Sequence, residues 1–335
     1  MATPQIRSAI PKSNPQFAMP SSVLITRRLP GAVVRRLEEK CDTDMHRGET
    51  PLTPEDLRAR AADKDALIVL LPDRIDRAVL DAAPRLKIIA NVAVGYDNLD
   101  VRHAAQKGVI CTNTPDILTD ATADLTWALI LDVTRRVSEG DRLARAGNWK
   151  GWTFEFMLGS GLQGKQLGIV GAGRIGRAVA ERARGFGMKV AVTSRRDPGW
   201  PDAEFMPLDR LLATSDVVSL HVLLSPETRG LIDQPALARM KRTAFLINTT
   251  RGAVVDESAL AWALKEHMIA GAGLDVFENE PQINAALPNL ENVVLSPHLG
   301  SATRETRTAM ADLAVSNVLA VLSGQPPLTP IAVRI

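Results

Sequence analysis

This chain alternates with great regularity between two kinds of segment. Short runs of β-branched and aliphatic residues are followed by longer amphipathic stretches almost from end to end. Such alternation is typical of βαβ units, whose parallel strands form a sheet with helices on its faces. The expected strands form two series: Ser22–Thr26, Ala66–Leu70, Lys87–Ala90 and Val109–Cys111, then Gln166–Val170, Lys189–Thr193, Asp216–Leu220, Ala244–Asn248, Ala270–Asp275 and Asn292–Leu295. The pattern predicts an α/β protein with two doubly wound parallel sheets.

Two long helical patterns indicate where the domains divide. One covers residues 121–145, follows the N-cap candidates Thr119 and Asp120, and separates the two strand series. The other covers residues 304–322, after the second series is complete. A helix left over at this point indicates that the second unit is inserted into the first. We therefore expect one domain from residues 22–118 plus 303–335, and an inserted domain from residues 119–302.

Composition excludes several other classes of protein. Apolar residues make up 45% of the chain and charged residues 23%, a balance typical of globular proteins. The formal charge is only +2, and the dispersed Lys and Arg residues form no basic stripe for a nucleic acid. No apolar run approaches the roughly 18 to 20 residues that a membrane-spanning helix needs. We expect neither nucleic acid nor membrane as a partner.

The cysteines and the N-terminal segment carry no sign of secretion or metal binding. Cys41 and Cys111 lie far apart and match no metal-ligand or redox spacing. We expect free thiols in a cytoplasmic protein, and no metal site. Residues 1–21 are polar and contain prolines but lack the apolar core of a secretory signal, so we predict a disordered extension there.

A glycine-rich turn follows the first strand of the second series. It reads Gly171-Ala172-Gly173-Arg174-Ile175-Gly176. In this pattern the first glycine permits a tight turn, the second lets the backbone approach a diphosphate, and the third lets helix and strand pack closely. Free N–H groups at the start of the following helix favour the anion. The order strand, turn, helix and strand predicts a Rossmann dinucleotide-binding unit whose cofactor contacts include Gly171, Gly173, Arg174, Ile175 and Gly176.

The end of the next strand predicts which dinucleotide is bound. An NAD enzyme usually places Asp or Glu there, where it accepts hydrogen bonds from the 2′-hydroxyl of the adenosine ribose. Here the residues are Ser194, Arg195 and Arg196, and the nearest acid, Asp197, comes later. Arginine binds phosphate bidentately. We therefore predict that these three residues bind the 2′-phosphate of NADP(H); the alternative is that both arginines are solvated loop charges and that NAD is used.

Three polar residues follow three expected strands of the second series. Arg251, Glu280 and His298 each lie just past a strand end. In open α/β sheets ligands bind outside the carboxyl ends of the strands, so the three side chains can converge on one crevice. Each residue alone could be a solvated or structural side chain, but the convergence of all three favours a functional site. We expect a catalytic site here.

These segments resemble those of the D-isomer-specific 2-hydroxyacid dehydrogenase family. The similarity extends from Ser22 onward and includes the glycine turn and the segments around Arg251, Glu280 and His298, together with Asn91–Asn98 and Thr119–Thr126. Asn148–Trp152, Pro297–Thr303 and Ser194–Arg196 are most similar to the glyoxylate/hydroxypyruvate reductases. The resemblance implies a Rossmann nucleotide domain inserted in a flavodoxin-like substrate domain.

The resemblance also implies a role for each site residue. Arg251 would hold the substrate carboxylate and polarise the 2-oxo group, His298 would protonate the carbonyl oxygen, and Glu280 would pair with His298. The backbone at Val94 and Gly95 would bind the carboxylate from the other domain. Further cofactor contacts, at the nicotinamide end, would come from Thr122, Thr249, Thr250 and Asp275.

We therefore expect an NADPH-linked reductase that converts glyoxylate or hydroxypyruvate into the D-2-hydroxy acid. Two alternatives remain open. One is an NAD-dependent D-2-hydroxyacid or phosphoglycerate dehydrogenase. The other is a dinucleotide-sensing corepressor, a class with the same fold; such proteins tend to carry long tails, whereas little follows Gly324 here.

The resemblance implies a two-fold homodimer formed through the nucleotide domain. The expected helix at 121–145 is more apolar than packing on its own domain needs. The residues concerned are Leu125, Trp127, Leu129, Ile130 and Val133. We expect a homodimer that uses this helix.

Overall fold

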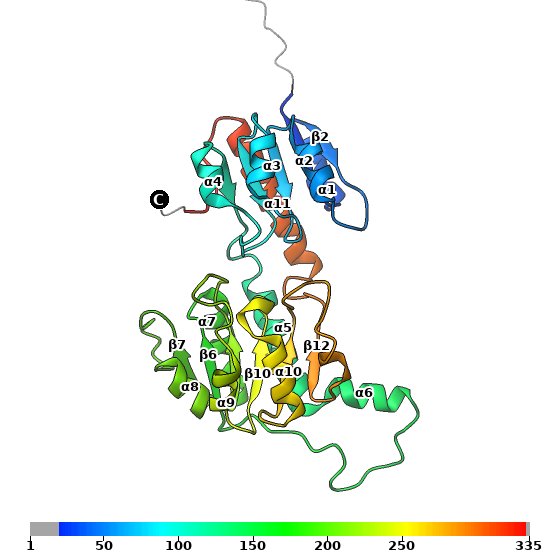
Figure 1. Cartoon of the computed structure of the whole chain (residues 1–335), viewed down its shortest axis with the longest axis vertical. Helices are drawn as coiled ribbons and strands as arrows, with labels where there is room; N and C mark the ends of the chain where they lie inside the picture. Colours follow the sequence, from blue (N-terminus) through cyan, green and yellow to red (C-terminus); the bar gives the residue numbers. More distant parts are fainter. Residues whose placement is uncertain (1–19, 333–335) are drawn as a thin grey trace, which may run out of the picture.

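The computed structural model describes residues 20–332 and divides them between two lobes that meet at a narrow waist (Figure 1). The first lobe contains a five-stranded parallel sheet in the order β2-β1-β3-β4-β5, which is the flavodoxin-like order. Its strands are β1 (Ser22–Ile25), β2 (Asp42–Met45), β3 (Ala66–Val69), β4 (Ile88–Asn91) and β5 (Ile110–Thr112). The strands β1, β3, β4 and β5 have mostly apolar residues on both faces, as expected of a parallel sheet that helices cover on both sides.

Helices cover both faces of this first sheet. They are α1 (Gly31–Glu38), α2 (Pro54–Ala61), α3 (Arg77–Ala82), α4 (Val101–Gln106) and the last helix, α11 (Arg304–Leu322). Thr53, Asp76 and Asp100 cap α2, α3 and α4 through their side-chain oxygens. In α11 the buried residues Ala311, Ala314, Val315 and Val318 recur at helical spacing and pack in the core shared with β1, β3 and β4. The chain thus returns to its first lobe at its C-terminal end.

The second lobe contains a seven-stranded parallel sheet in the order β12-β11-β10-β9-β6-β7-β8. Its strands are β6 (Gln166–Val170), β7 (Lys189–Thr193), β8 (Glu204–Phe205), β9 (Val217–Leu220), β10 (Phe245–Asn248), β11 (Gly271–Leu274) and β12 (Val293–Leu295). Counted from β6, this is the strand order of a dinucleotide-binding sheet with one further strand. The predicted fold class, two doubly wound parallel sheets, is confirmed.

Helices also cover both faces of the second sheet. They are α5 (Thr119–Arg135), α7 (Arg174–Arg182), α8 (Leu208–Thr214), α9 (Gln234–Arg239) and α10 (Glu257–Lys265), with 3-10 turns at Ala183–Phe186, Gly252–Val254 and Leu287–Asn289. A further helix, α6 (Val137–Arg145), projects away from the lobe and leads into a long exposed loop (Figure 1). The domain boundaries expected from the sequence stay a prediction.

Two short strands were missed from the sequence. β2 reads Asp-Thr-Asp-Met and β8 is only Glu-Phe, and both lie at the edge of their sheets. Edge strands are short and carry charged residues more often than central ones, so they lack the apolar run that marks a buried strand. Their polar sequences gave no such signal.

The long helix expected at 121–145 is wrong in two respects. It is broken at Arg136, which adopts a left-handed conformation with φ 56° between α5 and α6. Asp132 accepts hydrogen bonds from both the amide and the hydroxyl of Ser138, a local arrangement that competes with a continuous helix. Thr119 and Asp120 lie inside the first turn, and the N-cap is Leu118.

The reason given for dimerisation through this helix is also wrong. Of the five residues concerned, Trp127, Leu129, Ile130 and Val133 are buried within their own lobe, and Leu125 is half-buried. The Trp127 indole donates to the carbonyl oxygen of Val179 at 3.0 Å and stacks on Phe186. The apolar face of α5 is therefore already covered.

The ends of the described region bear on two further expectations. The extension expected at residues 1–21 lies outside the described residues except for its last two, and the Ser21 carbonyl already accepts from the Asp42 amide. Within residues 20–332, none of the helices has the length and apolar character needed to cross a membrane.

Candidate active site

The glycine-rich turn after β6 has the geometry expected of a diphosphate loop. Gly171 has φ +108°, and a Cβ there would lie 2.5 Å from the carbonyl oxygen of His221. A Cβ at Gly176 would lie 2.3 Å from the carbonyl oxygen of Gly171. A Cβ at Gly173 would meet no described atom within 4 Å. The outer glycines therefore allow close packing, and the middle one leaves open space beside the backbone.

The start of α7 offers donors to that space. Gly173 is the N-cap and has no side chain, so no side-chain acceptor caps the first N–H groups of α7 in the described chain. Such N–H groups favour an anion. Arg174 is exposed beside the opening and its Nε lies 2.5 Å from Oδ1 of Asp116, while Ile175 is half-buried. The residues present fit the diphosphate of a dinucleotide.

The loop after β7 carries two arginines with exposed side chains. The Ser194 hydroxyl donates to the carbonyl oxygen of Arg196, which closes a tight turn. Asp197 uses its carboxylate on the Gly199 amide, 2.8 Å away. Among residues 20–332, Arg195 and Arg196 form no ion pair. A hydrogen bond from Ser225, and secondarily the charge of Arg195, holds the pKa of Glu227 below its ordinary value.

Threonines line the space between α5 and the end of β10. Thr122 is buried and donates to the carbonyl oxygen of Gly300 at 3.2 Å. Thr126 and Thr249 share a hydrogen bond of 3.1 Å. Asn248 accepts from both the amide and the hydroxyl of Thr250, at 3.1 and 2.8 Å. Thr122 thus lies in the first turns of α5, and Thr249 and Thr250 lie in the loop after β10; their cofactor contacts stay a prediction.

Asp275, at the end of β11, supports the loop that carries His298. Its buried carboxylate accepts from the Ser296 hydroxyl at 2.6 Å and from the amides of Leu299 and Gly300 at 2.7 and 2.8 Å. Burial raises the pKa of Asp275 despite these donors. Its carboxylate is therefore largely occupied by the loop, and a direct nicotinamide contact stays a prediction.

His298 and Glu280 form a hydrogen-bonded pair. His298 Nδ1 lies 2.8 Å from Oε2 of Glu280, and the other carboxylate oxygen accepts from the Phe277 amide at 3.0 Å. Burial alone would raise the pKa of Glu280, but the hydrogen bond and charge of His298 outweigh it, and the pKa lies below its ordinary value. Because Nδ1 is engaged, Nε2 is the ring nitrogen left to face a substrate.

His298 has an unusual backbone conformation. Its φ is +55°, in the left-handed region that few residues other than glycine adopt. The His298 amide donates to the carbonyl oxygen of Asp275 at 2.9 Å, and the Asp275 carboxylate holds the next two amides. The end of β11 therefore holds His298 in a conformation that it would otherwise avoid.

A buried acid lies behind the Glu280 loop. Glu257, the first residue of α10, accepts from the Glu278 amide at 2.5 Å. Burial raises the pKa of Glu257, and the charges of Glu278 and Glu280 raise it further. The loops after β10 and β11 also touch directly, because a Cβ at Gly252 would lie 1.9 Å from the carbonyl carbon of Phe277. These contacts fix the Glu280 loop against the Arg251 loop.

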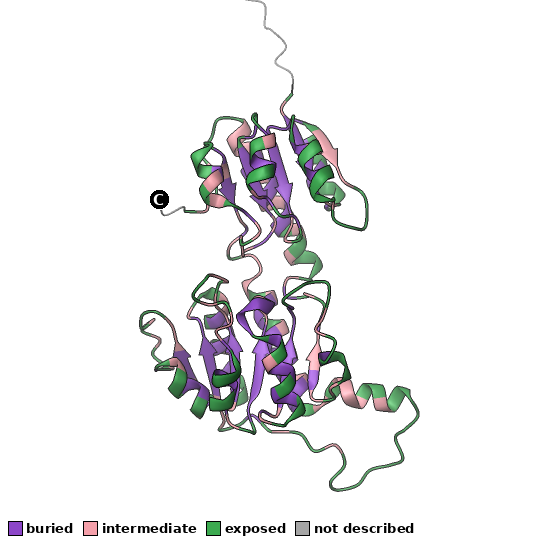
Figure 2. Ribbon diagram, in the orientation of Figure 1, coloured by how far each residue is buried: buried purple, intermediate pink, exposed green. Residues whose placement is uncertain are grey.

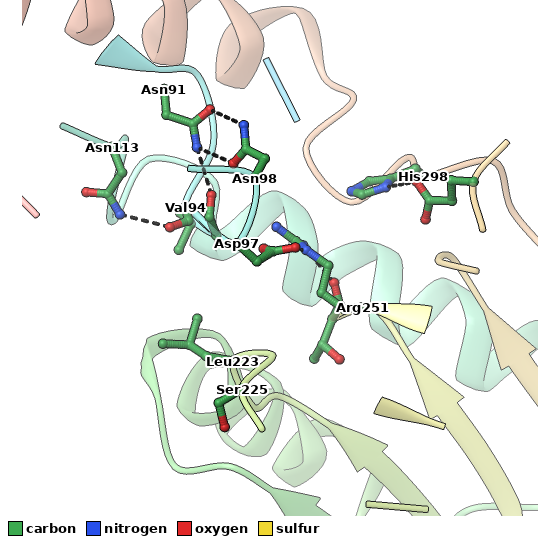
Figure 3. Close-up of polar contacts among 12 residues, drawn as sticks. Asn91, Val94, Asp97, Asn98, Asn113, Leu223, Ser225, Arg251 and His298 are labelled. Carbon is green, nitrogen blue, oxygen red and sulfur yellow. Dashed lines mark hydrogen bonds and ion pairs between the residues drawn. The ribbon is translucent and has the colours of Figure 1, made fainter. Parts of the chain in front are cut away.

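Arg251 extends from the end of β10 towards the first lobe (Figure 3). Its Nε donates to Oδ1 of Asp97 at 3.0 Å, and its Nη1 donates to the carbonyl oxygen of Thr250 at 2.8 Å. Asp97 follows β4, so the carboxyl edges of the two sheets face each other. Two carbonyl oxygens of the Asp97 loop accept side-chain hydrogen bonds: Asn113, which follows β5, donates to that of Val94 at 2.8 Å, and Asn91 donates to that of Gly95 at 2.9 Å.

The structure thus brings the three predicted catalytic residues to the ends of β10, β11 and β12, which are neighbours in the sheet. His298 and Glu280 are hydrogen-bonded. Arg251 bonds to neither in the described chain, although its charge helps to lower the pKa of Glu280. Their catalytic roles stay a prediction.

Several supporting residues were not identified from the sequence. Asn91 and Asn248 are each buried at the last position of an apolar strand, where a side-chain amide can form hydrogen bonds with the loop that follows. That position was the available signal. Ser296 and Glu257 gave none, because their partners lie far away in the chain.

Residues 127–300 match the family model described as "D-isomer specific 2-hydroxyacid dehydrogenase, NAD binding domain". Among curated proteins, the glyoxylate reductase of Thermococcus onnurineus is 49% identical over 319 residues, which cover 93% of this chain and 96% of the relative. The glyoxylate reductase of Pyrococcus furiosus is 47% identical over 319 residues, covering 93% and 95%.

Solved structures agree with these sequence matches. A protein from Thermus thermophilus superimposes with a TM-score of 0.89 at 48% identity, covering 93% of this chain and all of that one (100%). An NADPH-dependent glyoxylate/hydroxypyruvate reductase from Sinorhizobium meliloti, in complex with NADP and malonate, gives a TM-score of 0.84 at 36% identity, covering 93% and 97%.

Proposed function

Because this chain belongs to the D-isomer-specific 2-hydroxyacid dehydrogenase family and is a nicotinamide-dependent reductase of 2-oxo acids, we propose that it reduces glyoxylate or hydroxypyruvate with NADPH. The product is the corresponding 2-hydroxy acid, which for hydroxypyruvate is the D isomer; the product of glyoxylate has no stereocentre. One observation carries this proposal: a bonded His298–Glu280 pair and the guanidinium of Arg251 follow adjacent strands, at the same carboxyl edge of the sheet as the dinucleotide turn.

The reduction needs an anchor, a polarising charge and a proton. Arg251 attracts the carboxylate of the substrate and stabilises the charge that develops on its carbonyl oxygen. Amides of the Val94–Gly95 backbone bind the same carboxylate from the first lobe. The bound nicotinamide supplies the hydride to the carbonyl carbon. His298 delivers a proton from Nε2 to the carbonyl oxygen, and Glu280 stabilises the protonated ring through Nδ1.

The preference for NADPH rests on the loop after β7. Arg195 and Arg196 have exposed side chains without ion-pair partners among the described residues, at the end of the strand next to the dinucleotide turn. The acid nearest in the chain, Asp197, is bonded to the Gly199 amide. A 2′-phosphate placed there would gain charge-assisted hydrogen bonds from both guanidinium groups. Positions 194–196 hold no Asp or Glu, the residue types that usually accept from a 2′-hydroxyl at this strand end.

A panel of 2-oxo acids tests the proposal. Glyoxylate, hydroxypyruvate, pyruvate and 3-phosphohydroxypyruvate are each reduced with NADPH and with NADH, and kcat/KM is compared. We expect the highest values for glyoxylate or hydroxypyruvate with NADPH. Equal values with both cofactors would contradict the NADPH assignment. A preference for the phosphorylated substrate would contradict the substrate assignment, and binding of NADPH without turnover of any acid would favour a dinucleotide-sensing protein.

A homodimer is the second part of the proposal, now placed on a different surface. The arm made of α6 and residues 146–161 projects from the second lobe and is largely exposed (Figure 2). Its large apolar side chains are exposed by between 38% and 82% and comprise Val137, Trp149, Trp152, Phe154, Phe156 and Leu158. Several large apolar side chains exposed along one arm favour an interaction site, and a two-fold dimer is the commonest way to cover such side chains.

The oligomeric state is measured by light scattering at micromolar concentration. We expect twice the chain mass of 36.2 kDa. The double substitution Trp152→Ser and Phe154→Ser should shift the protein towards the single-chain mass without loss of cofactor binding. A mass of one chain for the unmodified protein would contradict the dimer.

We also propose a cytoplasmic location. Cys41 and Cys111 are both free and buried. Burial raises the pKa of both thiols, that of Cys111 to about 12, so neither forms the reactive thiolate at neutral pH. Two unpaired thiols of this kind suit a reducing compartment. Fractionation of cells that express the full chain tests this assignment.

A further inference from the structure

The guanidinium of Arg251 is held by an acid from the other lobe. Asp97 and Arg251 lie 154 positions apart in the sequence, and the Arg251 Nε donates to the Asp97 carboxylate at 3.0 Å (Figure 3). The exposed fraction of the Arg251 side chain is 21% and that of Asp97 is 35%. A half-buried pair with one good hydrogen bond restricts the rotation of a long side chain more than a fully solvated pair does.

The two terminal nitrogens of Arg251 differ in their hydrogen bonding. Nη1 is engaged by the Thr250 carbonyl, but Nη2 is buried and has no hydrogen-bond partner among the described residues. A buried charged donor without an acceptor is costly, so it signals a missing partner. The partner has to supply an oxygen, since Nη2 can only donate.

Gly95 shows where Nη2 points. A Cβ at Gly95 would lie only 2.0 Å from Nη2 and 3.2 Å from Oδ1 of Asp97. Only a glycine lets the guanidinium come this close to the loop. Because Asn113 and Asn91 bind the carbonyls of Val94 and Gly95, this loop is itself fixed in place.

We propose that Asp97 is a positioning residue for Arg251. By binding Nε, the Asp97 carboxylate turns the guanidinium so that Nη2 faces the Val94–Gly95 backbone, where the carboxylate of a 2-oxo acid binds. The proposal rests on the proposed function, because it assigns the missing acceptor of Nη2 to a substrate carboxylate, which would enter between Nη2 and Gly95 and separate them. It also gives the first lobe a side chain that acts on the substrate through a residue of the second.

A different role for Asp97 makes the opposite prediction. If Asp97 merely occupied the place of the substrate carboxylate, its removal would free Arg251 and strengthen substrate binding. The geometry favours positioning, because Asp97 binds Nε and leaves Nη2 unbonded, whereas a carboxylate that occupied the substrate site would be expected on Nη2 as well.

The test measures binding of oxamate, an unreactive amide analogue of pyruvate, by calorimetry in the presence of saturating NADPH. The variants are Asp97→Ala, Asp97→Asn, Arg251→Ala and the double variant Asp97→Ala with Arg251→Ala. Asn keeps an oxygen acceptor for Nε at nearly the same place. Asp100→Ala is the matched control, since Asp100 lies in the same loop but caps α4 and does not touch Arg251.

We expect Asp97→Ala to weaken oxamate binding about tenfold, a typical loss for one hydrogen bond to a charged group. Asp97→Asn should stay close to the unmodified protein, and Asp100→Ala should change stability but not the oxamate Kd. In the Arg251→Ala background, Asp97→Ala should add nothing, because it acts through Arg251. With glyoxylate, Asp97→Ala should raise KM more than it lowers kcat, and NADPH binding should not change.

Three results would overturn the inference: tighter or unchanged oxamate binding by Asp97→Ala, an equal loss of affinity in the Arg251→Ala background, or a parallel loss of NADPH binding. Calorimetry does not depend on turnover. If the Asp97→Ala effect on oxamate binding depends on Arg251 as expected but glyoxylate is not reduced, only the proposed substrate is contradicted. If the unmodified protein with NADPH does not bind oxamate, both the proposed function and the role of Asp97 are overturned.

Discussion

The loops after β10, β11 and β12 differ sharply from the loop after β7. In the first region, His298, Glu280, Asp275 and Arg251 are all bonded to other groups of the protein. In the second, Arg195 and Arg196 have exposed side chains and no ion-pair partner within residues 20–332. Groups that stabilise a transition state gain from being fixed in advance. Groups that select a cofactor by its phosphate can remain solvated until the phosphate arrives.

The largest expected effect comes from the fixed region. His298→Asn is preferable to an alanine variant, because Asn tolerates the left-handed conformation at this position. We expect kcat for glyoxylate to fall roughly 10²- to 10⁴-fold, the usual contribution of a positioned acid. NADPH binding, measured by fluorescence, serves as the control for folding. Near-normal kcat would show that His298 is not the proton donor.

The next largest effect comes from the exposed loop. Arg195→Ala removes one charged hydrogen-bond donor from the 2′-phosphate and should lower kcat/KM for NADPH by about ten- to a hundredfold. The value for NADH should hardly change. Arg210→Ala is the matched control, because Arg210 is an exposed arginine of the same lobe that is paired with Glu204. An equal loss with both cofactors would mean that Arg195 supports the fold rather than the phosphate.

A smaller, pH-dependent effect is expected from Glu280→Gln. The charge of Glu280 stabilises a protonated imidazole at 2.8 Å, so its loss should move the alkaline limb of kcat towards lower pH. The pKa of Glu280 is depressed below its ordinary value of 4.5, so the carboxylate is charged throughout the neutral range. Below both alkaline limbs the imidazole is protonated in either enzyme, so the difference in kcat that comes from this limb should disappear there. An unshifted alkaline limb would contradict the role of the pair.

The smallest effect is expected behind the active site. The pKa of Glu257 is raised above its ordinary value of 4.5, mainly by burial, so its ionised form is disfavoured in the folded protein. The resulting loss of stability sets in as the pH rises above the unfolded value and is complete above the folded one. Glu257→Gln keeps an oxygen acceptor for the Glu278 amide. The substitution should therefore raise Tm at neutral pH, and it should raise Tm less, or not at all, at pH 4. A change in Tm that does not vary with pH would contradict this account.

The sequence allowed the sheets, the glycine turn and the catalytic trio to be predicted, because each depends on a local pattern. A buried apolar strand, a glycine with φ +108° and a polar residue just past a strand can all be recognised within a few positions. The break at Arg136 and the exposure of Trp152 could not be predicted in this way. One depends on the bond between Asp132 and Ser138, and the other on the absence of a covering element in the described chain.

The same contrast applies within the site. Arg251 and His298 were found because they follow strands, whereas Asp97 and Glu257 act through contacts with residues far away in the chain. Long-range partners of this kind become visible only when the two lobes and their loops are placed in space. Residues that follow strand ends, to which we assign the chemistry, were therefore easier to pick out from the sequence than the residues that contact them from far away in the chain.

We thus assign the reaction to the hydrogen-bonded loops after β10, β11 and β12, and the preference for NADPH to the exposed loop after β7. The most direct test is the ratio of kcat/KM with NADPH to kcat/KM with NADH, measured with glyoxylate for the unmodified enzyme, Arg195→Ala and His298→Asn. We expect a ratio of about ten or more for the unmodified enzyme, a ratio near unity for Arg195→Ala, and for His298→Asn the unmodified ratio at a much lower rate. A ratio near unity in the unmodified enzyme, or one that changes with His298→Asn, would contradict the claim.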